Sequence, residues 1–421
     1  MLHRPGPALS LPHTTVWEPF MRRPARSSRP SRPSRPFRPL RPLRRAAALL
    51  ATAATAAAAL VVTAPAAPVG AASVLPSLPA PNAAGLTLRT WSVAAGQSDR
   101  MGDASVTSAA VFAAHGGTPS IDPVQVPVRV RILLPEDYQR DPAHPYPVLY
   151  LLHGGTGDVE QWSKTDEGNV TANLKGSAFK GIVVMPEGGK GGWYSDWPGH
   201  TDGFFAPQWE TFHVQQLVPW IDANFNTVRA ASGRAVAGVS MGGYGALRYA
   251  GRHPELFSAV GAFSPGTDIY DPGAQSIITN STWQVGASIL WTGLFDGKFR
   301  VTGDTPYRMA TVFGPPSTWP EQNPVNLALD GKYASYGGKM ALYAGGTGGT
   351  GEKEIGAMTA ALHQDLKDRA VTHRYCRGAG DHAWPYWGPE LKDFVAYAYG
   401  PAPETPQAPA PCPNGWGPET P

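Results

Sequence analysis

Ser240 lies at the centre of a pattern that suits nucleophilic attack on an acyl group. Residues 238–242 read Gly-Val-Ser-Met-Gly, follow the apolar run Ala235–Val239 and precede the helix-compatible run Gly243–Arg248. A serine on a sharp turn between a strand and a helix projects its hydroxyl from the sheet edge, and the flanking glycines let strand and helix cross closely. The glycine-flanked serine alone is a weak signal, so the strand and helix around it carry the prediction that Ser240 is a nucleophile.

A serine nucleophile needs a general base, and His382 fits that role best among the 11 histidines. It lies within residues 380–384, Gly-Asp-His-Ala-Trp, in a loop after the last predicted strand. The nucleophile, the acid and the histidine follow one another in this order in hydrolases built on a strand–serine–helix turn. The alternative for His382 is an ordinary surface-loop histidine.

The acid that orients the histidine is expected near the end of the preceding strand. That strand runs into the glycine-rich segment 345–351, which is followed by Glu352, Lys353 and Glu354. A carboxylate there would hold the imidazole tautomer and stabilise the imidazolium. We expect Glu354 to be this acid, with Glu352 second and Asp365 third. Both glutamates also fit a helix N-terminus, where the helix dipole favours negative charge.

Two backbone amides are expected to form an oxyanion hole. One belongs to Met241, the residue after the nucleophile, and the other to Gly155, in the loop after the predicted strand Val148–Leu152. His153 precedes this loop, and we expect it to shape the loop rather than to take part in catalysis.

Short apolar and β-branched runs, separated by helical stretches, predict a mostly parallel sheet with helices on both faces, which is an α/β fold of the α/β-hydrolase class. The first predicted strand alternates and ends at Pro135, which suggests an outer strand. The predicted strands are Val124–Leu134, Val148–Leu152, Ile182–Met185, Ala235–Val239, Ala259–Phe263, Met340–Tyr343 and Val371–Tyr375, and the predicted helices are Phe212–Asn224, Gly242–Arg252, Ile355–Arg369 and Glu390–Tyr399.

The segment of about 267–335 departs from this alternation of strands and helices, because it is rich in Trp, Pro and Gly and shows no regular hydrophobic periodicity. We interpret it as an insertion over the active site. A lid or acyl-pocket wall and a rigid structural excursion are equally compatible with this composition.

Charge and hydropathy divide the N-terminal segment from the rest of the chain. The net charge is +3, but residues 1–45 hold 11 arginines and one acid, which leaves −7 for the remainder. The mildly acidic body argues against nucleic-acid binding.

Arg44 and Arg45 precede the apolar, alanine-rich stretch Ala46–Val62, and small residues follow as far as Ala72. Residues 1–72 therefore predict an export signal with a long Arg/Pro-rich n-region and cleavage near Ala72, in preference to a membrane anchor. Either the general or the twin-arginine export route fits.

Further boundaries follow from composition. Residues 73–84 are predicted to be a Pro/Ala linker, residues 85–400 the catalytic domain, and residues 401–421 a mobile Pro-rich tail.

The two cysteines, Cys376 and Cys412, would either pair and tie the tail to the body or remain free thiols. Zinc-type spacing and a P-loop ending are missing from the sequence, so no cofactor and no metal is expected.

Several sequence blocks resemble the esterase D branch of the α/β-hydrolases, which includes S-formylglutathione hydrolases and the secreted antigen-85 mycolyltransferases. The likeness covers about residues 124–400. The blocks are Ile-Val-Val-Met-Pro at 182–186, Tyr-Ser-Asp-Trp at 194–197, Trp-Glu-Thr-Phe at 209–212, Leu-Val-Pro-Trp at 217–220, Phe-Gly-Pro-Pro at 313–316 and His-Ala-Trp-Pro-Tyr-Trp at 382–387.

The resemblance implies a triad of Ser240, His382 and a glutamate, with the amides of Gly155 and Met241 as the oxyanion hole. Three departures accompany it. The family's Asp-Gly loop reads His153-Gly154 here, the mycobacterial cysteine pair between the second and third blocks is missing, and the family's glutamate does not align cleanly with the glycine-rich spacing. Residues 85–123 match no part of the family pattern.

These features predict a secreted serine carboxylesterase that acts on a small-molecule, lipid or glycolipid ester through an acyl-serine. The alternative is an acyltransferase that passes the acyl group to a sugar or glyceride alcohol. A minor alternative is an extracellular binding protein with a vestigial site. Association with the cell envelope is compatible with each. Five tryptophans are candidates to stack on a sugar or to wall an acyl chain, although core packing is the preferred interpretation for any single one: Trp162, Trp193, Trp197, Trp384 and Trp387.

Overall fold

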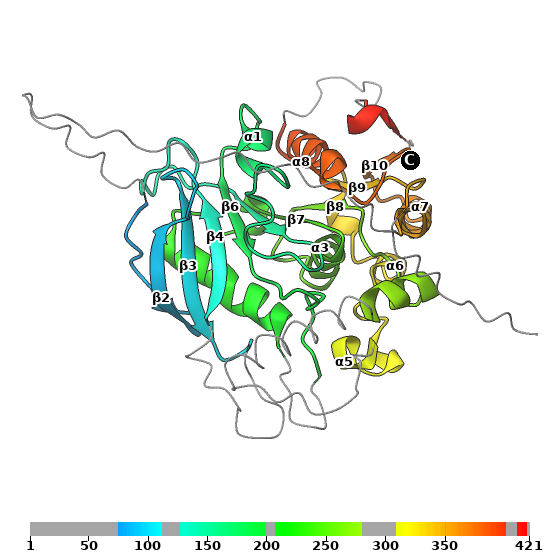
Figure 1. The fold of residues 1–421 in the computed structure, drawn as a ribbon, viewed down its shortest axis with the longest axis horizontal. Helices are drawn as coiled ribbons and strands as arrows, with labels where there is room; N and C mark the ends of the chain where they lie inside the picture. The colour runs from blue at the N-terminus through cyan, green and yellow to red at the C-terminus, as the bar shows by residue number, and fades with distance from the viewer. Residues whose placement is uncertain are drawn as a thin grey trace, which may run out of the picture. The chain divides into compact units, whose positions relative to one another are not determined.

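The strands of the described residues form one twisted sheet with a parallel centre. A computed structural model of the protein describes residues 75–111, 127–198, 207–279, 309–349, 351–400 and 411–418. Within these residues, 11 strands follow the order β1-β2-β3-β4-β6-β5-β7-β8-β9-β10-β11 (Figure 1). Pairing is parallel from β6 through β5, β7, β8 and β9 to β10, and antiparallel outside that run. The predicted α/β-hydrolase architecture is confirmed.

The strands are β1 (Asn82–Ala83), β2 (Leu86–Val93), β3 (Met101–Ser108), β4 (Val128–Leu133), β5 (Val148–Leu152), β6 (Ile182–Pro186), β7 (Arg234–Val239), β8 (Ala259–Phe263), β9 (Met340–Ala344), β10 (Arg374–Arg377) and β11 (Gly417–Pro418). The helices are α1 (Val170–Leu174), the π-helical Thr211–Leu217, α2 (Val218–Asn224), α3 (Met241–Arg252), α5 (Met309–Phe313), α6 (Pro324–Leu329), α7 (Glu352–Asp368) and α8 (Trp384–Tyr399), with short 3₁₀ turns at Ala231–Gly233, Pro316–Thr318, Ala334–Tyr336 and Pro413–Gly415.

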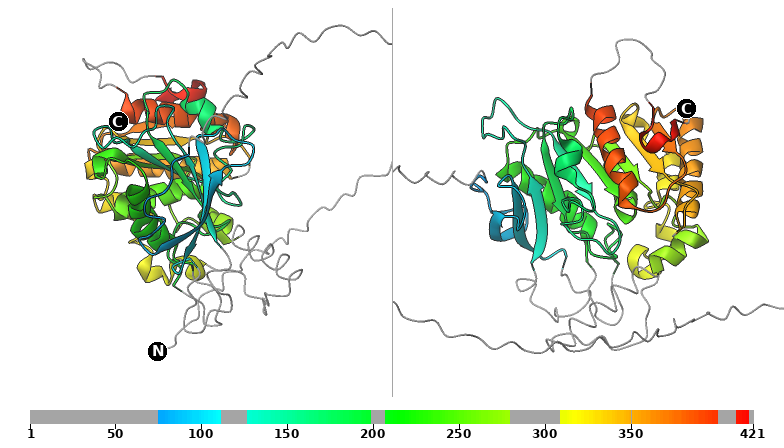
Figure 2. Two further views of the ribbon diagram at one scale, coloured as in Figure 1. Left: turned by 90° about the vertical axis from the view of Figure 1, so that its left-hand side faces the viewer. Right: turned by 45° about the horizontal axis from the view of Figure 1, so that its top comes forward.

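Alternating side chains of the central strands enter two separate apolar cores. On β5, Val148, Tyr150 and Leu152 face one core, and Leu149 and Leu151 face the other. Helices α2, α3, α6 and α7 supply the first core, whereas α1 and α8 supply the second. Figure 2 shows these helices on both sides of the sheet. Strands buried on both faces explain why the sequence of this region shows continuous apolar runs.

The N-terminal part of the sheet corrects two predictions. Strand β4 is not the outer strand, because β3, β2 and β1 continue the sheet beyond it. Residues 75–84 are also part of the packed domain rather than a free linker. Leu75 and Leu78 pack against the core, and the amide of Ala80 donates to the side chain of Asn224 at 2.9 Å. Local composition did not reveal these long-range contacts.

The insertion and the two termini are described in part. Residues 272–279 form a helix, and α5 and α6 lie in the second half of the insertion. Residues 280–308 and the predicted export signal at 1–72 lie outside the described residues. Among the residues that are described, no helix combines the length and apolar composition needed to cross a membrane.

The end of the tail is bound to the domain, which corrects the prediction of a wholly mobile tail. Strand β11 pairs with β10, and Cys376 forms a disulfide with Cys412. Residues 401–410 lie outside the described part.

Candidate active site

Ser240 occupies a strained turn between β7 and α3. Its backbone has φ 56° and ψ −117°, a conformation that a residue with a side chain rarely adopts. The turn is tight because strand and helix nearly touch. A Cβ on Gly238 would lie 2.3 Å from the carbonyl oxygen of Gly242, and a Cβ on Gly242 would lie 2.4 Å from that of Leu152. Only glycine fits at either position, so the predicted elbow geometry around Ser240 is present.

His382 is held by a buried carboxylate. Its Nδ1 lies 2.7 Å from Oε2 of Glu352. Glu352 begins α7 and is 0% exposed, whereas the His382 side chain is 19% exposed. The other oxygen of Glu352, Oε1, accepts from the amide of Gly345 at 2.6 Å and from the hydroxyl of Ser264 at 2.9 Å. Hydrogen bonds to both oxygens thus hold the Glu352 carboxylate in place.

The expectation that Glu354 is the carboxylate beside His382 is wrong in this structure. The Glu354 side chain is exposed and lies beside Gly273, in the helical segment 272–279. Residues two apart on an α-helix point to sides roughly 200° apart, so only one of the two glutamates can face the histidine. Asp365, the third candidate, lies more than three turns further along α7.

The hydrogen bond between His382 and Glu352 defines the tautomer of His382. An ionised carboxylate only accepts hydrogen bonds, so Nδ1 carries a proton and donates the hydrogen bond to Glu352. Nε2 is then the basic nitrogen of the neutral ring. The ring also packs edge-on against Trp387, with centroids 4.8 Å apart.

Ser264 and Trp387 complete the support of the carboxylate, and the sequence did not single out Ser264. Trp387 Nε1 donates to the Ser264 hydroxyl at 2.9 Å, and that hydroxyl in turn donates to Glu352. Ser264 follows β8 directly, and β8 pairs with the elbow strand β7. Its position at the carboxyl end of a neighbouring parallel strand is the signal that could have placed it in the site.

The loop after β5 is shaped by His153, as predicted. The amide of Gly188 donates to His153 Nε2 at 2.9 Å, so Nδ1 carries the ring proton and donates to the carbonyl of Gly154 at 2.8 Å. One ring nitrogen is therefore bonded within the loop, and the other connects the loop to Gly188, which follows β6. Gly154 lies against Ser240, because a Cβ there would be 3.6 Å from the serine Cβ. Gly155, the next residue, is half-buried.

A largely apolar pocket adjoins Ser240. It encloses about 360 Å³, part of which is open to solvent. The lining residues are Trp193, Ser240, Tyr244, Gly266, Asp268, Ile269, Ala274, Ile277, Ile278, Ile355 and Met358. The aliphatic and thioether side chains among them come from the insertion and from α7, and Tyr244 comes from α3.

The five candidate tryptophans have different positions. Trp193 lines the pocket, and Trp387 supports His382. Trp162 is fully buried, and its Nε1 donates to the carbonyl of Leu152, so it belongs to the core. Trp197 is also buried, with Nε1 bonded to Gly192. Trp384 packs edge-on against Trp162 and Trp387.

Comparison with known proteins bears on this site. The family model described as putative esterase matches residues 123–398. The chain belongs to this esterase family. Esterase Rv1288 of Mycobacterium tuberculosis is 39% identical over 204 residues, which is 46% of this chain and 43% of that protein. The chain thus spans less than half the length of this relative.

A second group of relatives carries a different name. Diacylglycerol acyltransferase/mycolyltransferase Ag85B of Mycobacterium leprae is 28% identical over 273 residues, covering 58% of this chain and 73% of that protein. The suspected family is confirmed by the family model together with these two kinds of relative. Among solved structures, a ferulic acid esterase matches 66% of this chain and 93% of its own, with 22% identity and a TM-score of 0.49.

Proposed function

We propose that this protein is a serine carboxylesterase whose catalytic triad is Ser240, His382 and Glu352. The observation that carries the proposal is the 2.7 Å bond between His382 and the buried Glu352. The elbow turn that holds Ser240 supports it. Ser240, Ser264 and Glu352 all follow strands of the parallel sheet. The Ser240 amide donates to the carbonyl of Phe263, and the next residue, Ser264, contacts Glu352. The groups therefore gather at one edge of the sheet.

The proposed reaction proceeds through an acyl-serine. The Ser240 Oγ attacks the ester carbonyl carbon while His382 Nε2 takes the hydroxyl proton. Glu352 remains ionised and stabilises the imidazolium through Nδ1. The imidazolium then protonates the leaving alcohol. Water, activated by the same nitrogen, attacks the acyl-serine and releases the acid.

The amides of Met241 and Gly155 are proposed to bind the oxyanion. Met241 is the first residue of α3, and the first amides of a helix have no partner within the helix. Developing negative charge is favoured at that end by the helix dipole. The apolar pocket beside Ser240 is suited to the acyl group, because aliphatic side chains favour a hydrocarbon over a polar chain.

The test compares hydrolysis of p-nitrophenyl butyrate by the wild type, Ser240→Ala and His382→Ala, with circular dichroism as the control for folding. We expect both variants to lose at least about 10³-fold in kcat. Labelling by a fluorophosphonate should be confined to the peptide that contains Ser240. A folded wild type with neither turnover nor labelling would refute the proposal and favour a binding protein with a vestigial site.

Acyl transfer is the second candidate function, and the similarity to the acyltransferase/mycolyltransferase relatives favours it. The chemistry is shared as far as the acyl-serine, after which an alcohol replaces water. Product analysis with and without a sugar or glyceride acceptor distinguishes the two. A new ester that appears only with the acceptor supports transfer, whereas unchanged products and rates leave hydrolysis as the function.

We also propose that the protein is exported, with residues 1–72 as the removed signal. The Cys376–Cys412 disulfide supports this, because disulfides persist in oxidising compartments outside the cytosol. N-terminal sequencing of the protein recovered from the medium or envelope of the expressing cell should begin near residue 73. A cell-bound product that retains Ala46–Val62 would favour an anchor.

A further inference from the structure

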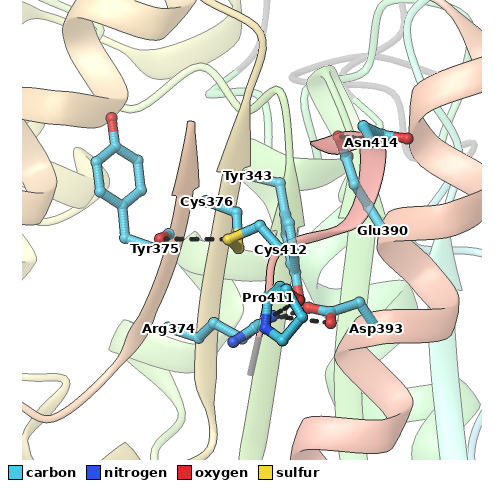
Figure 3. The surroundings of a disulfide bond; sticks show 9 residues. All are labelled: Tyr343, Arg374, Tyr375, Cys376, Glu390, Asp393, Pro411, Cys412 and Asn414. Atoms are coloured by element: carbon cyan, nitrogen blue, oxygen red, sulfur yellow. Dashed lines mark hydrogen bonds and ion pairs between the residues drawn. A yellow bond between two sulfur atoms is a disulfide. The ribbon is translucent and has the colours of Figure 1, made fainter. Parts of the chain in front are cut away.

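The C-terminal residues 411–418, here called the strap, lie against the loop that carries His382. Figure 3 shows where the strap joins the sheet and α8. Cys412 is bonded to Cys376 of β10, and Arg374 of the same strand donates to the carbonyl of Pro411 at 3.0 Å. Strand β11 extends the sheet by pairing with Cys376 and Arg377. The loop to His382 begins directly after Arg377.

Trp416 is the strap residue that reaches this loop. It is 6% exposed, and its Nε1 donates to the carbonyl of Ala379 at 3.0 Å. Its ring lies directly over the loop backbone, because a Cβ on Gly378 would be 2.2 Å from the indole and one on Gly380 would be 2.8 Å from it. The ring also stacks on Tyr386 of α8, with centroids 5.8 Å apart.

The same loop also contacts the glycine-rich segment that leads to Glu352. The amide of Gly348 donates to the carbonyl of Gly380 at 3.0 Å, and the amide of Gly349 donates to the carboxylate of Asp381 at 2.9 Å. The loop is thus in contact both with Trp416 and with residues 348–349. The two segments that present His382 and Glu352 to each other are therefore held together by contacts outside the pair itself.

We propose that Trp416, anchored by the Cys376–Cys412 disulfide, is a positioning residue. It holds the 378–382 loop in the conformation in which His382 is hydrogen-bonded to Glu352. This inference rests on the proposed esterase function. Loop residues 378–380 include two glycines, whose backbone freedom is large, so the loop depends on outside contacts for its conformation. Small displacements of catalytic groups reduce the rate far more than they reduce substrate binding.

The structure offers a matched control in Trp91. Its ring covers Gly102, where a Cβ would lie 2.2 Å from the indole, and its Nε1 donates to the carbonyl of Pro76 at 2.9 Å. Trp91 makes the same two kinds of contact as Trp416, but in the antiparallel part of the sheet formed by β2 and β3. Trp91→Ala therefore reports the cost of losing such an indole without affecting the histidine loop.

The experiment compares Trp416→Ala, Trp416→Phe, the double variant Cys376→Ser/Cys412→Ser and Trp91→Ala in the purified protein. We expect kcat for p-nitrophenyl butyrate to fall about tenfold or more in Trp416→Ala and in the double variant, with KM within about twofold of the wild type. Trp416→Phe should restore most of the rate, because it retains a ring over the glycines. Trp91→Ala should lower Tm and leave kcat unchanged.

A second readout does not depend on turnover. The Nδ1 proton of His382, bonded to a carboxylate, should give a far-downfield proton NMR line that is lost in His382→Ala. We expect this line to broaden or disappear in Trp416→Ala and to persist in Trp91→Ala. If both the line and kcat of Trp416→Ala equal those of Trp91→Ala, the positioning role is overturned. If the wild type hydrolyses no ester, the proposed function fails, and the NMR line alone decides the role of the strap.

Discussion

Two glutamates of this protein each bind a histidine at 2.7 Å, but their surroundings differ. Glu210 contacts His253 and also forms ion pairs with Arg248 at 2.8 Å and Arg252 at 2.7 Å. Glu352 contacts His382, and its other hydrogen-bond donors are the neutral Gly345 amide and Ser264 hydroxyl. Both carboxylates are buried, at 5% and 0% exposure.

The different partners of the two glutamates distinguish a structural pair, Glu210–His253, from a pair suited to catalysis, Glu352–His382. Burial alone would raise the pKa of Glu210, but the charge of Arg248, the hydrogen bond from His253 and the charge of Arg252 together lower that pKa well below its usual 4.5. Its negative charge is therefore already neutralised by guanidinium groups. The charge of Glu352 is directed to the one partner that can gain and lose a proton, which is the arrangement that stabilises an imidazolium.

Glu352→Gln is expected to give the largest effect. The amide keeps the size of the side chain but no longer provides a charge, and it can present an N–H to Nδ1, which favours the wrong tautomer of His382. We expect kcat to fall about 10³- to 10⁴-fold, as measured with p-nitrophenyl butyrate.

Glu354→Gln is the matched control, since it makes the same chemical change two residues along α7 on an exposed side chain. Its kcat should stay within about twofold of the wild type. A large loss in Glu354→Gln with a normal Glu352→Gln would reverse the assignment of the acid.

Glu210→Gln is expected to affect stability instead of chemistry. The change leaves the buried Arg248 without its carboxylate, which typically costs about 3–5 kcal/mol of unfolding free energy. The kcat per folded molecule should be retained. Urea unfolding at pH 7 measures the first quantity, and active-site titration with a fluorophosphonate corrects the second. Normal stability combined with lost turnover would contradict the structural role of this pair.

The pH dependence of the same variant sharpens the comparison. The pKa of Glu210 is lower in the folded state than in the unfolded chain, so its contribution to stability is present above the unfolded pKa of about 4.5 and is lost as the pH falls below it. The stability difference between the wild type and Glu210→Gln should therefore shrink as the pH is lowered through 4.5. A difference that stays constant or grows in acid would contradict this account.

The elbow turn at Ser240 and the central strands could be predicted because their signals are local. Strands β5, β6, β8 and β9 are short apolar runs, and the elbow around Ser240 needs glycines at fixed positions. The choice between Glu352 and Glu354 depended on the rotation of α7. Glu352 continues the buried stripe of Ile355, Thr359, Leu362 and Leu366 at spacings of three or four, so helical periodicity contained the missing signal.

The strap and the N-terminal strands could not be predicted in the same way. Strand β2 is largely exposed and polar, so it lacks the apolar run that identifies β5 or β8. The strap consists of a few residues in a Pro-rich segment, and its order comes from the disulfide and from Trp416 rather than from local propensity. Contacts distant in sequence determined both regions.

Ser264→Ala is expected to lower kcat less than Glu352→Gln does, because it removes one of the donors to Glu352 and leaves the charge in place. The variant also leaves the Trp387 Nε1 proton without its acceptor, and an unsatisfied buried group costs about 1–3 kcal/mol. We expect kcat to fall about tenfold, with KM little changed.

Ser108→Ala is the matched control, because the Ser108 hydroxyl makes the same two kinds of hydrogen bond. It donates to the side-chain oxygen of Gln216 at 2.7 Å and accepts from the backbone amide of Ala110 at 3.1 Å. Equal stability losses with unequal rates would show that Ser264 acts on the Glu352–His382 pair, whereas equal rates would limit it to packing.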